Sequence, residues 1–187
     1  MKRLFAFSLT VGLLGCVKNA SVAPPALQHT AADFFALKVG TQWDYEVELL
    51  GAKKTNEVRL VKQNREGYFE DSTGAQFLVD AFGVRDQKRY LLRNPIAVGT
   101  SWTNVVSVSS VEHYEIVGVE QPCATRGGRW DDCVTVESRN RIGEGKALVN
   151  QYTLAPGVGI VSLGTLLETD GRHIPQARLE LVRFSSP

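Results

Sequence analysis

The chain has 187 residues and is almost neutral, with 21 Lys and Arg against 20 Asp and Glu. This length suffices for one domain of ordinary size and would crowd two. A neutral chain with interspersed charges argues against a nucleic-acid partner, which requires a basic face. The same balance argues against electrostatic docking on a membrane, so that a lipid would have to supply any attachment.

The first 15 residues have the pattern of a secretory signal peptide. Lys2 and Arg3 precede an apolar run over residues 4–14, which is too short to span a bilayer because a spanning helix needs about 20 apolar residues. The segment Leu13-Leu14-Gly15-Cys16 resembles the lipobox of bacterial lipoproteins. That resemblance implies cleavage before Cys16 and acylation of its thiol. The alternative is an ordinary signal peptide with a chance cysteine.

Residues 16–29 contain two prolines and show no periodicity, which predicts a lipidated cysteine followed by a flexible tether. Val17 is not Asp, and by resemblance to lipoproteins of bacteria with two membranes this favours the outer membrane, facing the periplasm. Residues 30–187 would then form the folded domain. At its start, Thr30 to Asp33 is expected to cap a short helical turn, with Phe34, Phe35 and Leu37 packing onto a sheet.

Apolar and polar side chains alternate through most of the remaining chain. The clearest case is Trp43, Tyr45, Val47 and Leu49, because a period of two predicts a strand. Further strands are expected at 57–62, 67–70, 76–82, 84–92, 105–109, 112–120, 133–141, 147–154, 160–167 and 176–184. Short connections pair successive strands antiparallel. The sequence therefore predicts a mainly β fold, a single curved antiparallel sheet or partly open barrel of about 10–11 strands, with at most a short N-terminal helix.

One pentad occurs twice with a single substitution, as Val39-Gly40-Thr41-Gln42-Trp43 and as Val98-Gly99-Thr100-Ser101-Trp102. An internal duplication would explain it. A second explanation is that the same turn was used twice, in each case a Gly-Thr turn that places a Trp in the sheet. We favour this second interpretation because nothing else recurs at the same offset.

Cys123 and Cys133 form an even pair in a chain expected to be exported, with Gly127-Gly128 midway between them. A hairpin turning at the glycines would bring the two thiols together, which predicts a structural disulfide. A metal site would need further ligands nearby, and a redox pair would favour C-x-x-C spacing.

Candidate reactive residues are few. His29, His113 and His173 lie far apart without metal-ligand spacing, and His113 is interpreted as a sheet residue rather than a ligand. Adjacent carboxylates on a strand point to opposite faces, so Asp131-Asp132 is a poor calcium site. The sequence predicts no catalytic residue, no metal and no cofactor. Trp43 and Trp102 are the candidates for lining an apolar pocket, although such residues more often belong to a core.

Three segments carry a resemblance to a family. They are Leu37 to Tyr45 with its G-x-x-W, Gly128 to Val134 with a central aromatic-x-x-Cys-Val, and Ala155 to Val161 with A-P-G-V-G. Together they resemble a loosely defined family of secreted and lipid-anchored bacterial proteins, although Arg129 replaces the usual Thr. The resemblance implies a single antiparallel-sheet domain, loosely like open-barrel lipoprotein carriers, and assigns no catalytic residue.

These observations predict a non-enzymatic, lipid-anchored protein of the cell envelope, attached to the membrane through Cys16. It would bind an apolar ligand or an envelope protein on its curved sheet. The alternative from another class is a structural or interaction subunit of an envelope complex with no ligand cavity, and an enzyme is a third hypothesis. An apolar cavity of several hundred Å³ on the inner face would favour ligand binding over a filled core.

Overall fold

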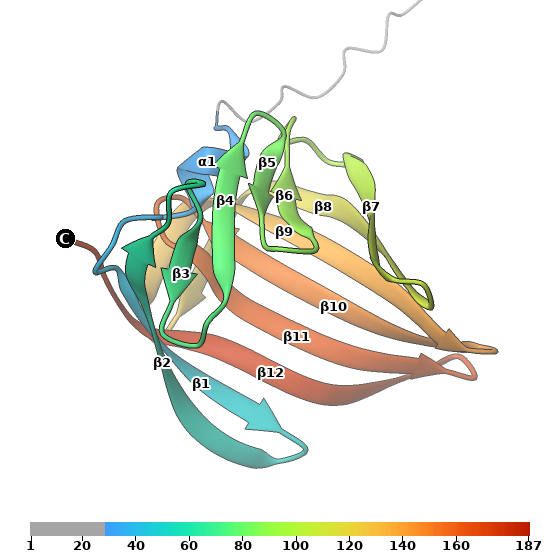
Figure 1. The fold of residues 1–187 in the computed structure, drawn as a ribbon. Coiled ribbons are helices and arrows are strands. Elements are labelled where there is room, and N and C mark those ends of the chain that lie inside the picture. The colour runs from blue at the N-terminus through green and yellow to red at the C-terminus, as the bar shows by residue number, and fades with distance from the viewer. Residues whose placement is uncertain (1–28) are drawn as a thin grey trace, which may run out of the picture.

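The computed structural model describes residues 29–187 and is nearly all antiparallel sheet (Figure 1). The predicted signal peptide, Cys16 and all but the last residue of the predicted tether lie outside the described residues. The elements are α1 (Ala31–Phe34), β1 (Gln42–Leu49), β2 (Ala52–Gln63), β3 (Phe69–Asp71), β4 (Gln76–Asp80), β5 (Gly83–Arg85), β6 (Tyr90–Arg93), β7 (Ser101–Ser107), β8 (Ser110–Thr125), β9 (Gly128–Gly143), β10 (Lys146–Ala155), β11 (Gly159–Thr169) and β12 (Arg172–Ser185).

The 12 strands form a single sheet in the order β6-β5-β4-β3-β2-β1-β12-β11-β10-β9-β8-β7. Strands that follow one another in sequence are paired, except β6 and β7, and the first and last strands meet where β1 pairs with β12. The sheet curls so far that it forms a nearly closed barrel, with β6 and β7 at its two edges (Figure 1). The predicted fold class is confirmed, with 12 strands where the sequence indicated about ten or eleven.

Strand lengths divide the barrel into a closed end and an open end. β3 to β6 have three to five residues, whereas β8 and β9 have 16 each. The short strands lie in front of one half of the long ones, beside α1, and leave the other half uncovered (Figure 1). Val84 and Leu92 of the short strands pack in one core with Val134 and Val136 of β9.

Helix α1 closes the covered end. The Thr30 N–H and hydroxyl both donate to Asp33 Oδ2, at 2.7 and 2.9 Å, and these hydrogen bonds satisfy groups that a helix start leaves free. Phe34 is completely buried in the first core, and Phe35 packs against it. Leu37 packs in a second core, which contains Trp43 and Leu181.

The repeated pentads have the same backbone hydrogen bonds. Gly40 N–H donates to the Leu60 carbonyl and Leu60 N–H to the Thr41 carbonyl, at 2.8 and 2.9 Å. In the second copy, Gly99 and Thr100 make the same two bonds with Ile116, both at 2.9 Å. Each Gly has a positive φ, which a side chain disfavours. Each pentad therefore attaches its turn to the second strand of the hairpin that follows.

The segment from Gln76 to Leu92 differs from its prediction. The sequence predicts a hairpin of two strands about Gly83. The turn lies there, but the second strand is interrupted. The Asp86 carboxylate accepts the N–H groups of Lys88 and Arg89 at 2.6 and 2.7 Å. Asp favours such turns because its side chain bonds nearby backbone, so that one expected strand becomes β5 and β6.

Candidate functional site

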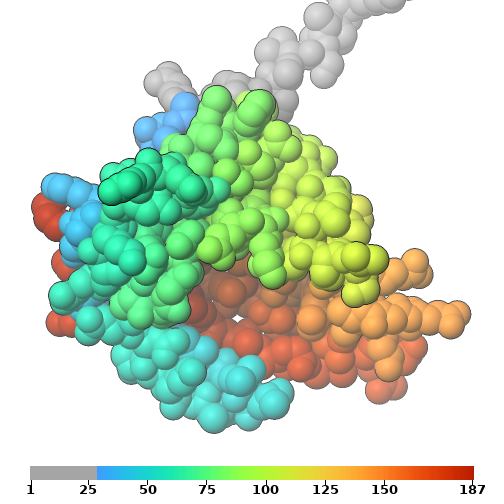
Figure 2. Space-filling view, viewed as in Figure 1, coloured from blue at the N-terminus to red at the C-terminus, as the bar shows by residue number. Residues whose placement is uncertain are grey.

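The inner face of the barrel contains an apolar pocket of about 200 Å³. Its wall is almost entirely apolar, with one carboxylate, and comes from six strands and two connections: Phe35, Leu37, Trp43, Tyr45, Val58, Leu60, Asp71, Phe77, Val158, Gly159, Ile160, Leu163 and Leu179. Figure 2 shows a hollow between β1–β2 and β5–β7, with atoms of the C-terminal strands at its floor. The pocket is smaller than the roughly 300–1,000 Å³ of typical ligand sites.

Two aromatic side chains of β1 are fixed in this wall by hydrogen bonds. Trp43 Nε1 donates to the Val158 carbonyl at 2.7 Å, and Tyr45 Oη donates to the Ile160 carbonyl at 2.8 Å. Burial raises the pKa of Tyr45 above its usual value of about 10, so its hydroxyl stays neutral. The polar atoms of both rings are thereby satisfied, and their apolar faces can contact a ligand.

Cross-strand register arranges the inner face in rows. The row beside the pocket is apolar and consists of Ile116, Val136, Tyr152, Leu163, Leu179 and Val47. The next row toward the open end is polar over most of its length and consists of Tyr114, Ser138, Asn150, Thr165, Ala177 and Leu49. Within this polar row, Thr165 Oγ1 donates to Asn150 Oδ1 at 2.8 Å, and Asn150 Nδ2 donates to Ser138 Oγ at 3.1 Å.

A third row lies closest to the open end. It consists of Glu112, Asn140, Leu148, Leu167 and Ile174, and it is apolar over β10 to β12. A ligand that followed this face outward from the pocket would meet apolar, then hydrogen-bonding, then apolar surface. The arrangement therefore matches a narrow apolar chain with a polar group along its length.

Side chains close the barrel where its edge strands β6 and β7 meet. Asn104 Oδ1 accepts the Tyr90 N–H at 3.0 Å, and Asn104 Nδ2 donates to the Tyr90 carbonyl at 3.1 Å. Trp102 Nε1 donates to the same carbonyl at 2.9 Å. Trp102 also stacks on Tyr114 with ring centroids 5.4 Å apart. Of the two candidate tryptophans, the structure places Trp43 at the apolar pocket and Trp102 in this seam.

An ion pair supports the seam from the inside. Arg89 donates to both Glu112 oxygens, from Nε at 2.7 Å and from Nη2 at 3.1 Å, and Tyr114 Oη donates to Glu112 Oε2 at 3.0 Å. Hydrogen bonding to Glu112 raises the pKa of Arg89, and burial raises the pKa of Tyr114. Arg89 compensates the negative charge of the Glu112 carboxylate, and Tyr114 donates a further hydrogen bond to it. The carboxylate is therefore held inside the barrel as a structural group.

Cys123 and Cys133 are joined in a disulfide with Cα atoms 6.0 Å apart. They are offset in the β8–β9 ladder, since Cys123 lies opposite Trp130 and Cys133 opposite Gln121. The hairpin turns at 126–127. Beyond the disulfide its tip reaches β12, where Gly127 N–H donates to the Leu181 carbonyl at 3.0 Å. The bridge thus secures the hairpin close to the tip that contacts β12.

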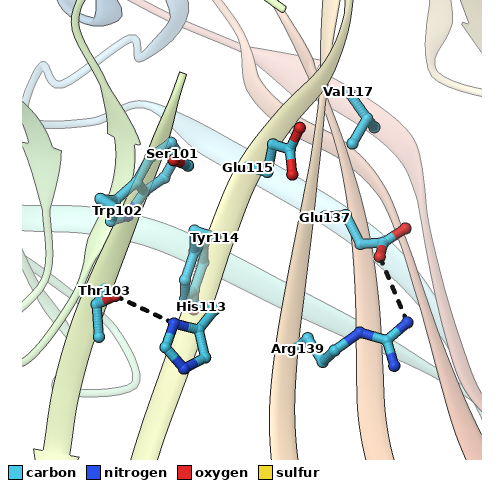
Figure 3. A pocket seen from close by; sticks show the side chains of 9 residues that line it. All are labelled: Ser101, Trp102, Thr103, His113, Tyr114, Glu115, Val117, Glu137 and Arg139. Atoms are coloured by element: carbon cyan, nitrogen blue, oxygen red, sulfur yellow. Dashed lines mark hydrogen bonds and ion pairs between the residues drawn. The ribbon is translucent and has the colours of Figure 1, made fainter. Parts of the chain in front are cut away.

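The histidines of the described chain lie outside the inner face. His113 and Thr103 are exposed on the outer face, with Thr103 Oγ1 and His113 Nδ1 3.1 Å apart (Figure 3). They border a shallow hollow of about 420 Å³ that also contains the Glu137–Arg139 pair. Among residues 29–187 no carboxylate is hydrogen-bonded to His113, so a hydroxyl and an imidazole meet there without the third group that would orient the ring.

Within residues 29–187, no group of three or more His, Cys, Asp or Glu side chains is placed to hold a metal ion. No helix in the same part of the chain is long and apolar enough to cross a membrane.

Several site residues were not anticipated from the sequence. Tyr45 belonged to the alternating run that predicted β1, but its role in a pocket depends on Leu163 and Leu179, more than 100 residues away in the chain. One feature of the sequence pointed to Asn104, because it is a polar residue at an inward position of an alternating segment. Nothing in the sequence paired it with Tyr90.

Comparisons with known proteins add two distant likenesses. No protein-family model matches the chain, and a search of curated proteins finds no significant match. Among solved structures, a Bacteroides fragilis protein described as exported and as having a YmcC-like fold has a TM-score of 0.45 at 13% identity, over 82% of this chain and 99% of that one. A protein of Parabacteroides distasonis described as a lipoprotein has a TM-score of 0.44 at 11% identity, over 81% and 98%. At these scores neither likeness bears on the function.

Proposed function

We propose that this protein is a non-enzymatic, lipid-anchored protein of the cell envelope that binds an acyl chain on the inner face of its barrel. The observation that carries the proposal is the apolar pocket beside the closed end, whose wall includes Trp43, Tyr45, Leu163 and Leu179. A pocket of about 200 Å³ is too small for a bulky ligand and suits a narrow, flexible one.

The polar row supports a ligand that carries a hydrogen-bonding group. Asn150 and Thr165 lie on the same face as Leu163, one row farther from the closed end. Their hydroxyl and amide groups can donate to and accept from an ester, amide or hydroxyl on the ligand. Because the adjacent rows are apolar over β10 to β12, such a group would have its partners only at this level.

Ligand binding is tested with a dansyl-labelled fatty acid, using as the signal the rise in dansyl fluorescence when the probe, excited directly, leaves water for an apolar site. The variant Leu179→Trp adds volume to the pocket wall, and the matched control Arg178→Trp adds the same ring to the neighbouring exposed position of β12. We expect Leu179→Trp to weaken probe binding about tenfold or more and Arg178→Trp to leave it unchanged.

Three results would contradict the proposal. Absence of probe binding to the parent protein, or equal binding by both variants, would favour the alternative of a structural subunit without a ligand site. Recovery of a chemically altered probe would contradict the non-enzymatic part. Circular dichroism of both variants shows whether a loss of probe binding comes from a filled pocket or from misfolding of the chain.

The anchor rests on Cys16 and its lipobox-like context, and outer-membrane attachment facing the periplasm follows from Val17 by resemblance. Two or three acyl chains are enough for stable attachment, since each buried CH₂ contributes roughly 0.8 kcal/mol. We expect labelled palmitate to be incorporated into the parent protein and not into Cys16→Ser. Incorporation into both, or into neither, would contradict the anchor and leave the ligand proposal to its own test.

A further inference from the structure

Exposed apolar side chains gather at the open end of the barrel. Four hairpins end there (Figure 1), and each carries at least one such side chain. Seven of the 13 large exposed apolar residues in the described chain belong to these hairpins: Leu49, Leu50, Val105, Val108, Val111, Ile142 and Ile174. Leu50 is 78% exposed and Val108 is fully exposed. Single exposed apolar residues are ordinary, but a concentration on one edge marks an interaction surface.

Register places three of these hairpin turns side by side. Gly143 lies opposite Lys146, Lys146 opposite Thr169, and Thr169 opposite Arg172. The β7–β8 turn adjoins them, because Glu112 of β8 lies opposite Asn140 of β9. These turns form a continuous edge of the sheet. The β1–β2 turn is set back, since Leu49 lies opposite Ala177, five residues along β12 from Arg172.

The same four hairpins carry an excess of cations. Residues 49–54, 105–112, 141–146 and 169–174 together contain Lys53, Lys54, Arg141, Lys146 and Arg172, with three carboxylates, Glu112, Glu144 and Asp170. Glu112 points inward to Arg89, and Lys53 is paired with Glu46 at 3.3 Å. Within residues 29–187, the other four cations make no ion pair. Elsewhere on the described surface some cations, such as Arg126 and Arg183, are paired with carboxylates, and others, such as Lys88 and Arg129, are not.

Apolar turns flanked by unpaired cations are complementary to an anionic lipid surface. Apolar side chains enter the boundary between headgroups and acyl chains, while Lys and Arg remain with the anionic headgroups. We propose that the open end of the barrel, defined by these four hairpins and named the hairpin edge, docks on a bilayer that contains anionic phospholipid. The near-neutral total charge argued against such docking, but the total charge does not register that these cations are gathered at one end.

Docking at the hairpin edge would join the inner face to the bilayer. The third inner row, which includes Leu148 and Leu167, leads to Ile174 within the edge itself. An acyl chain could then pass between bilayer and pocket along protein surface without crossing open water. This consequence rests on the proposed function, whereas docking itself does not require a ligand.

The test is co-sedimentation with vesicles, using the chain from residue 17 onward. This chain carries all of the described structure but neither the apolar leader nor Cys16. Vesicles are made of phosphatidylcholine alone or with about one-third phosphatidylglycerol. We expect binding to the anionic vesicles that is at least about tenfold stronger than to the neutral ones and that weakens with added salt.

Two variants of the hairpin edge separate its two contributions. Lys54→Glu with Arg172→Glu should abolish the preference for anionic vesicles, and Leu50→Ser with Val108→Ser should weaken binding to both kinds of vesicle about tenfold or more. The matched controls are Arg65→Glu and Val98→Ser, exposed positions outside the edge, which should bind as the parent does.

Docking is contradicted if the parent chain does not sediment with anionic vesicles, or if edge and control variants bind alike. Concentration-dependent dimers that disappear in Leu50→Ser with Val108→Ser would instead assign the edge to self-association. The fatty-acid probe assay is run on the same variants, whose pocket is intact. Probe binding without vesicle binding would overturn docking alone, and vesicle binding without probe binding would overturn the ligand proposal alone.

Discussion

At the scale of single residues, the side-chain amide of Asn104 takes the place of a backbone peptide group as a hydrogen-bond partner. Its side-chain amide donates to the Tyr90 carbonyl and accepts from the Tyr90 N–H, as a neighbouring strand would do in a ladder. Asn104 is buried, so water cannot replace these hydrogen bonds to the Tyr90 backbone. One side chain thereby joins the two edges of a sheet that has no ladder between β6 and β7.

We predict that Asn104→Leu destabilises the protein by about 2 kcal/mol, because it leaves a buried N–H without an acceptor. Asn104→Asp keeps that acceptor but loses the donor and places a charge beside Glu112, so we expect a loss of at least similar size. Urea unfolding of the oxidised protein measures both. The control Thr103→Val, at the exposed neighbouring position, should change stability by no more than about 0.5 kcal/mol. Equal effects at the two positions would contradict the role of Asn104.

At the scale of elements, strands were predictable where alternation was strict. β1 begins one residue before Trp43 and ends at Leu49, because its apolar positions all face one side. The ends of β8 and β9 were not predictable. Both strands run to the turn at 126–127 through bulges at which Glu120 and Asp132 adopt positive φ, and bulges disrupt the period on which the pattern depends.

The repeated pentads illustrate a second limit of local pattern. Their common sequence correctly indicated a turn that delivers a Trp into the sheet, and both indoles donate to backbone carbonyls, Trp43 to Val158 and Trp102 to Tyr90. What surrounds each ring depends on the strands placed opposite. Trp43 borders a pocket and Trp102 a closed seam, so nearly identical pentads place their tryptophans in different environments. Each pentad also opens a run of six strands.

At the scale of the whole molecule, the two six-strand runs meet at two unequal junctions. β1 and β12 are joined by a ladder of eight residue pairs. β6 and β7 are joined by the side chains of Asn104 and Trp102, and the Arg89–Glu112 pair adds a link between the β5–β6 connection and β8. Both junctions, like the pocket wall, connect residues that are far apart in the chain. This is why the sequence predicted a curved sheet but could not say where it closes.

The unequal junctions predict where the barrel opens first. β6 and β7 each have a ladder on one side only, and local opening requires the fewest broken bonds where strands are short and singly paired. In hydrogen–deuterium exchange followed by mass spectrometry, we expect residues 86–108 to exchange well before β10 and β11, which are paired on both sides. Asn104→Leu should speed exchange in 86–108 and leave β10 and β11 unchanged. Earlier exchange in β1 and β12 would mean that the ladder, and not the side-chain seam, is the weaker junction, and the barrel would then open beside Trp43 and the pocket.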